Sequence, residues 1–110
     1  MTTMIRILHL ADAPSVTIPI RIYAPIAEAV DWSCRAKIGW PDDPWGRDVT
    51  GVDAIQAHEM ALRLVGPELY TSDLHKARRL VWLELGQGYG FPVPIILRDL
   101  LIGEDRKRFG

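Results

Sequence analysis

Cysteine is almost missing from this sequence, since Cys34 is the one cysteine among 110 residues. A lone cysteine rules out an intrachain disulfide and any zinc site assembled from several thiolates of the same chain. No apolar run approaches the roughly 20 residues that a membrane-spanning helix needs, and the first residues show no charged leader ahead of an apolar stretch. We therefore expect a cytoplasmic protein without membrane contact.

An excess of charge of either sign is also missing. Thirteen basic residues stand against fourteen acidic ones, which gives a formal net charge of -1. Nucleic-acid binders use a basic surface to displace counterions from phosphates, so the charge balance argues against nucleic acid as a partner. Two basic runs, over 75–79 and 106–108, leave weak binding through a local patch as an alternative.

Catalytic and metal-binding motifs are missing as well. His58 and Glu59 resemble the start of the zinc-protease pattern H-E-x-x-H, but Leu62 stands where its second histidine belongs. The sequence has no G-x-S-x-G elbow for a serine nucleophile, and Asp42 and Asp43 lack the spacing of a calcium loop. We expect no metal and no cofactor, and the absence of such motifs argues against an enzyme.

Three strands are predicted in the first forty residues. Residues 4–10 and 16–24 are apolar and β-branched and predict a hairpin, and "DWSCRAKIGW" at 31–40 alternates with period two. Pro19 cannot donate to a ladder, so the second strand lies at an edge or the proline nitrogen faces away from its neighbour. Such an edge is weakly protected and would allow a homodimer. Residues 41–51, rich in Pro, Asp and Gly, predict a surface loop.

The period then becomes helical. A helix is predicted over 51–65, with Thr50 as its cap, Gly66-Pro67 as its stop and a buried stripe that includes Ile55 and Leu62. Residues 80–86 predict a fourth strand, and a short C-terminal helix precedes a tail that frays from about residue 103. The segment 67–79 gives no clear pattern.

This order, β-β-β-α-β-α, predicts a single α+β domain over residues 1–110. A mainly antiparallel sheet of about four strands would carry one main helix on one face.

The segment "GQGYGFPVP" at 86–94 invites comparison with phosphate-binding loops. Its glycines follow the spacing G-x-G-x-G rather than G-x-G-x-x-G, and Pro92 and Pro94 prevent a helix from starting there. We therefore interpret the glycines as a turn or bulge that needs special dihedral angles.

Two surfaces remain as candidate sites. Aromatic residues beside mixed charges are typical of protein contacts, which favours a partner-binding loop made of Trp40, Asp42, Asp43, Trp45 and Arg47. The leading hypothesis is a non-catalytic bacterial protein-binding module, either an inhibitor or an immunity-like partner. The alternative is a small-molecule pocket, or a modest enzyme, lined by His58, Tyr89 and Phe91.

Four segments together carry a resemblance: "DWSCRAKIGW", "GVDAIQAHEMAL", "GQGYGFPVP" and "LRDLLIGEDRK". Through them the chain resembles a group of small uncharacterised bacterial proteins that carry a domain of unknown function. Their length is about one hundred residues, a common size for one domain. The resemblance implies a bacterial single-domain protein and supplies no catalytic residue.

Overall fold

A β-hairpin opens the fold, as the sequence predicts. In the computed structural model, which describes residues 3–110, strand β1 (Met4–Leu10) pairs antiparallel with β2 (Ala13–Ile22). The alternation in β2 is confirmed, because its even positions from 18 onward are buried and those between them are not. The buried side chains are Ile18, Ile20 and Ile22.

Pro19 lies inside the sheet, so the prediction that β2 is an edge strand is wrong. β2 pairs with β1 on one side and with β4 (Trp32–Ile38) on the other. The Pro19 carbonyl accepts the N–H of Gly39 at 2.8 Å, and a strand residue directs its nitrogen and its carbonyl to the same side. The proline nitrogen therefore faces away from β1 and toward the side of β4. It lies there beside Gly39, one residue past Ile38, where the ladder between β2 and β4 ends. This confirms the second alternative drawn from the sequence.

Strand β5 (Trp45–Gly51) corrects the prediction of a loop over 41–51. It pairs antiparallel with all of β4, and the Pro-rich and Asp-rich turn is confined to the start of that segment. Asp48 lies opposite Arg35 and accepts two hydrogen bonds from its guanidinium, at 2.7 and 3.0 Å. Inward side chains of β5 pack against the core: Trp45 and Val49.

Two short strands complete an antiparallel sheet of six strands. β3 (Ile26–Ala27) pairs with the start of β4, and β6 (Leu80–Val81) pairs with the end of β1. The predicted strand over 80–86 is therefore correct only at its start. Leu83 is 80% exposed and has a positive φ of 61°, so the chain turns away from the sheet there.

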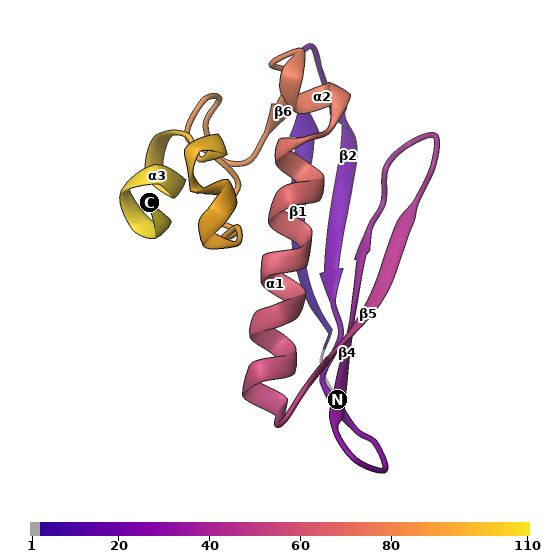
Figure 1. Cartoon of the computed structure of the whole chain (residues 1–110). Helices are drawn as coiled ribbons and strands as arrows, with labels where there is room; N and C mark the ends of the chain where they lie inside the picture. Colours follow the sequence, from indigo (N-terminus) through magenta and orange to yellow (C-terminus); the bar gives the residue numbers. More distant parts are fainter. Residues whose placement is uncertain (1–2) are drawn as a thin grey trace.

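Helix α1 (Ala54–Tyr70) lies along one face of the sheet (Figure 1). Its cap is Asp53, whose carboxylate accepts the Gln56 N–H at 2.7 Å, while the Gln56 side chain accepts the Val52 N–H; Thr50, the predicted cap, belongs to β5. The buried stripe is narrower than predicted, because Ile55 is 77% exposed. Four residues spaced by four form it: Ala57, Ala61, Val65 and Leu69.

Helix α1 also runs past its predicted end at Gly66-Pro67. Leu69 and Tyr70 are buried, and the Thr71 N–H and hydroxyl both bond to the Pro67 carbonyl, at 2.9 and 2.7 Å. Burial of the last turn outweighs the local stop signal.

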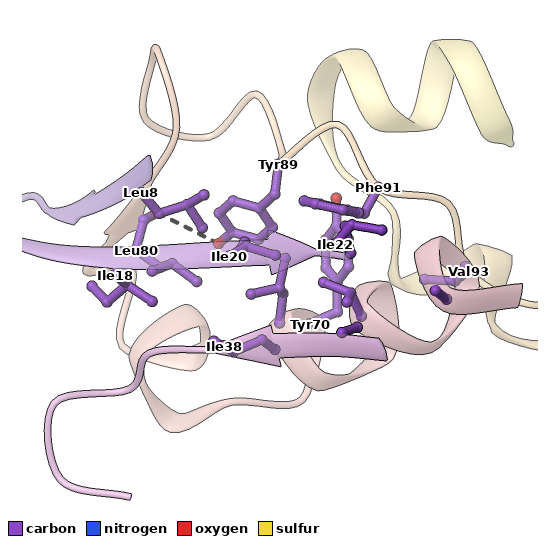
Figure 2. Close-up of a cluster of buried hydrophobic side chains, with 14 of the residues drawn as sticks. Leu8, Ile18, Ile20, Ile22, Ile38, Tyr70, Leu80, Tyr89, Phe91 and Val93 are labelled. Carbon is purple, nitrogen blue, oxygen red and sulfur yellow. Dashed lines mark hydrogen bonds between the residues drawn. The ribbon is translucent and has the colours of Figure 1, made fainter. Parts of the chain in front are cut away.

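The rest of the chain packs beside the helix and the sheet (Figure 1). The unassigned segment contains the short helix α2 (Asp73–Lys76), and a 3-10 turn, η1 (Ile95–Leu100), precedes α3 (Gly103–Phe109). The tail expected to fray is thus a helix. Figure 2 shows strand residues such as Leu8 and Ile20 in one core with Tyr70, Tyr89 and Phe91. No helix in the described part of the chain has both the length and the apolar character needed to cross a bilayer.

Candidate functional site

The glycine segment, residues 86–90, binds an anion that belongs to the chain itself. Gly86, Gly88 and Gly90 all have positive φ, at 84°, 87° and 74°. This conformation turns successive amides toward one point, where the Tyr89 and Gly90 N–H groups donate to the two carboxylate oxygens of Asp105 at 2.8 and 2.7 Å. A Cβ on Gly88 would overlap the Asp105 side chain. The interpretation of the glycines as a turn with special dihedral angles is confirmed.

Asp105 anchors a cluster of rings, which we call the anchor cluster: Tyr70, His75, Tyr89 and Asp105. The Tyr70 hydroxyl donates to Asp105 at 2.5 Å, and the Tyr89 hydroxyl lies 2.5 Å from Nδ1 of His75. The three rings contact one another at centroid distances of 4.9 to 5.5 Å. Burial lowers the pKa of His75 and raises the pKa of both tyrosines, with the Asp105 carboxylate adding to the tyrosine shifts.

The anchor cluster has the geometry of a structural support. Asp105 is only 3% exposed, and none of the four residues lines either of the two hollows described below. Arg6 completes the support because its Nη1 donates to the Tyr89 and Gly90 carbonyls at 3.1 and 3.0 Å. The cluster holds the glycine segment and α3 against α1, so Tyr89 is a core residue rather than the predicted pocket wall.

The larger hollow lies at one end of the sheet, where the β4–β5 turn approaches α2. Its volume is about 470 Å³, and we call it the acidic groove. Half of its lining residues are apolar: Leu10, Val16, Trp40, Pro41 and Leu74. Asp42, Asp43 and Asp73 stand around it without an ion pair inside residues 3–110, whereas its one cation, Arg79, is neutralised by Asp12 at 3.1 Å.

The structure places the five residues of the predicted partner-binding loop in two separate groups. Trp40, Asp42 and Asp43 meet in the acidic groove. Trp45 and Arg47 lie on β5, where the guanidinium covers the indole ring at 5.6 Å. Both tryptophans are half-buried and pack against the core, so neither is the freely exposed aromatic that the sequence suggested.

The smaller hollow, of about 250 Å³, lies between α1, the first strands and the glycine segment. We call it the His58 pocket. Its lining includes Arg6 and two of the three residues named from the sequence as pocket candidates, His58 and Phe91. The Nε2 atom of His58 is buried and has no hydrogen-bond partner among the described residues.

Cys34 is buried in the sheet, where a thiol is a weak nucleophile. The Cys34 thiol donates to the Tyr23 carbonyl at 3.2 Å, and burial, together with the nearby Asp48 charge, raises its pKa. Between residues 3 and 110 no group of three or more His, Cys, Asp or Glu side chains could hold a metal ion.

Comparison with known protein families identifies the family of this chain. The model of a family described as Domain of unknown function (DUF6968) matches residues 4–93. The chain belongs to this family. No curated protein and no solved structure is similar enough to count as a match.

The DUF6968 match includes the glycine segment and ends before Asp105, the carboxylate that this segment binds. Sequence reasoning missed Asp105, because an aspartate within the charged run at 104–108 has the pattern of a solvated helix. The position of Arg6 on the buried side of the sheet could have been predicted from the sequence. It shares the inward face of β1 with Leu8 and Leu10, so the period-two pattern places a cation on the buried side of the sheet.

Proposed function

We propose that this DUF6968 protein is a non-catalytic protein-binding module that takes a basic segment of a partner into the acidic groove. The observation that carries the proposal is the combination, in one hollow, of apolar lining residues with three carboxylates that have no ion pair within residues 3–110. The proposal follows the inhibitor or immunity-like hypothesis drawn from the sequence.

Charge complementarity selects the kind of partner. Asp42, Asp43 and Asp73 outnumber Arg79, whose charge Asp12 already offsets. Opposite charge on a partner would speed association and fix the register of the complex, while Trp40 and Leu74 supply the apolar contact that slows dissociation. The groove therefore suits Lys or Arg side chains, whose aliphatic stems lie on apolar surface while their charged ends reach carboxylates.

Site-specific photo-crosslinking tests the proposal. A benzophenone amino acid replaces Pro41, at the groove, or Asp99, an exposed residue that does not line it. After irradiation in the host cell, mass spectrometry should identify one protein crosslinked from position 41 and absent from position 99, and the crosslinked segment should be rich in Lys or Arg. Equal capture from both positions, or an acidic segment, would contradict the proposal.

A synthetic peptide of that segment then measures the role of charge. The double variant Asp42→Asn/Asp43→Asn should bind it at least about tenfold more weakly, and the loss should shrink at high salt. Glu84→Gln/Asp99→Asn removes the same charge from exposed positions outside the groove and serves as the control. Equal weakening by both double variants would show that the net charge of the protein, and not the groove, determines how tightly the peptide binds.

A further inference from the structure

The outer edge of strand β1 is covered at one end and open at the other. β6 pairs with its last two residues, His9 and Leu10, and the chain then turns away from the sheet at Leu83, where φ is 61°. Residues 4–8 pair with β2 on one side and with no strand of the described chain on the other. The first part of β1 is therefore an open sheet edge.

The backbone groups of Ile5 and Ile7 point out of this edge. Ile7 lies opposite Pro19, whose carbonyl accepts the N–H of Gly39 on the β4 side of β2. Because residues opposite each other in an antiparallel pair either exchange both hydrogen bonds or none, Ile7 directs its N–H and its carbonyl away from β2. The direction alternates along the strand, so Ile5 points outward too, as His9 does toward β6. No hydrogen bond from the outward groups of Ile5 and Ile7 is found within residues 3–110.

Apolar side chains accompany these free backbone groups. Met4, Ile5 and Ile7 are 47%, 55% and 49% exposed, and the two isoleucines lie on the sheet face that α1 does not cover. Native proteins protect such edges with proline, lysine or a bulge, and residues 4–8 contain none of these. Arg6 is the one charged residue there, and its Nη1 is held by two carbonyls of the glycine segment. The edge is therefore ready to accept another strand.

We propose that two copies of the chain pair antiparallel through this edge, with Ile5 of one copy opposite Ile5 of the other. Each Ile5 then donates its N–H to the carbonyl of the other, and each Ile7 exchanges the same two hydrogen bonds with Thr3 of the second copy. The added strand runs antiparallel to β1 and continues the line of β6, so the two sheets become one. The surface is separate from the acidic groove and does not depend on the function proposed for it.

Side chains exclude the neighbouring registers. A two-fold axis at Arg6 would set the two Arg6 side chains directly opposite each other, and like charges in that position are destabilising. An axis at Ile7 would require His9 to pair with Ile5, but His9 already pairs with β6. With the axis at Ile5, Met4 lies opposite Arg6 of the second copy and exposed β-branched side chains meet on the outer face. The formal net charge of -1 adds little repulsion between two copies.

Disulfide formation in the full chain tests the pairing and its register. Ile5→Cys places two thiols on directly opposed residues, whose Cα atoms lie about 5.5 Å apart in such a pair, within the range of a disulfide. Ile7→Cys has nearly the same exposure on the same face, but its two copies would lie four residues apart along the ladder, about 13 Å, which is too far. Under mild oxidation Ile5→Cys should form a covalent dimer at least about tenfold faster than Ile7→Cys. The unchanged protein should form none, because Cys34 is buried.

Sedimentation equilibrium provides a second measurement, without any crosslink. The unchanged protein should show a monomer–dimer equilibrium, and Ile5→Lys should raise its dissociation constant at least about tenfold because it sets like charges opposite each other. Ile26→Lys is the matched control, since it makes the same change at an isoleucine of β3 that is 59% exposed, and it should leave the constant unchanged.

Three results would overturn the proposal. They are equal crosslinking rates of the two cysteine variants, equal weakening by Ile26→Lys, and a protein that stays monomeric up to about 1 mM. The last result would leave the edge of β1 to a strand of another protein.

Discussion

Asp105 concentrates more hydrogen bonds than any other side chain described here. Two backbone amides and the Tyr70 hydroxyl donate to it inside the core. Three donors satisfy most of the carboxylate's acceptor sites, which offsets the cost of burying the charge. The side chain also links three separate parts of the chain, namely α3, α1 and the glycine segment.

Asp105→Asn should therefore destabilise the protein strongly. The amide would point an NH₂ group at a backbone N–H or at the Tyr70 hydroxyl, so one buried donor would lose its acceptor. We expect a loss of about 2–4 kcal/mol in the free energy of unfolding, measured by urea denaturation. Asp99→Asn, at an exposed position, should change it by less than about 0.5 kcal/mol. A similar small change for both variants would show that the anchor cluster contributes little.

His75 makes stability depend on pH in a definite direction. Burial lowers the pKa of His75 in the folded protein below its unfolded value near 6.5. Between these two pKa values the unfolded chain binds more protons, so stability is full above about pH 7 and falls as the pH drops through this window. Below the pKa of His75 in the folded protein, the loss of stability caused by this group is complete.

His75→Gln removes this contribution. The free energy of unfolding of the variant should fall less steeply between pH 7 and 5 than that of the unchanged protein, in urea titrations at each pH. The ring contacts to Tyr70 and Tyr89 are also lost, so the variant should be less stable at pH 8. Parallel pH profiles for the two proteins would contradict the assignment of the slope to His75.

Gly66 in α1 gives the sequence a helix-end signal that the structure does not follow. Followed by Pro67, it has the pattern of a helix end, yet the helix continues to Tyr70. The glycine serves packing: a Cβ at this position would overlap the Pro92 carbonyl oxygen and press on the Val93 side chain. Absence of a side chain lets the segment after the glycines lie directly on the helix.

Gly66→Ala should consequently destabilise the protein, although alanine is about 1 kcal/mol better than glycine in a helix interior. The overlap involves a backbone atom, which cannot move as a flexible side chain can, so we expect a net loss of about 1–3 kcal/mol in thermal or urea unfolding. A rise in the melting temperature would show that the contact with Pro92 relaxes easily.

The predictions from sequence held where local pattern and burial agree. The hairpin and the strand at 32–38 were predicted because alternation alone decides which face is buried. β5 was missed because its polar residues, Gly46 to Asp48, belong to an edge strand that needs little apolar surface. Of the predicted pocket, His58 and Phe91 do line one hollow, but Tyr89 turns to His75 through contacts between distant segments.

The C-terminal segment is part of the fold of the whole molecule. Leu101 is fully buried and Asp105 nearly so, although both lie beyond the end of the family match at Val93. A chain that stops after Val93 would leave the amides of Tyr89 and Gly90 without their carboxylate. We expect this truncated chain to lose cooperative unfolding or most of its stability, measured by circular dichroism during heating. A truncated chain that melts like the full one would assign the stability to the sheet and α1 alone.

β5 is an outer strand of the sheet and β2 is not, so a homodimer that pairs through an exposed edge could form along β5, as an alternative to β1. Arg35 directs its carbonyl to Tyr23, away from β5, so its partner Asp48 directs its own backbone groups outward. By the same alternation Thr50 faces outward and Val49 faces β4. The Arg47 side chain covers the outward carbonyl of Gly46, which protects one end of this edge.

Proline substitutions distinguish the two sides of β5. Thr50→Pro removes an N–H that points away from β4, so the fold of the monomer should stay intact. A dimer that pairs along β5 should be abolished by this change, and sedimentation at increasing protein concentration would show the loss. Val49→Pro removes a hydrogen bond to β4 and should destabilise the monomer by about 1–3 kcal/mol. A dimer that survives Thr50→Pro would place the contact elsewhere, and a protein that stays monomeric at all concentrations would leave β5 as a free edge, protected by the charges of Arg47 and Asp48.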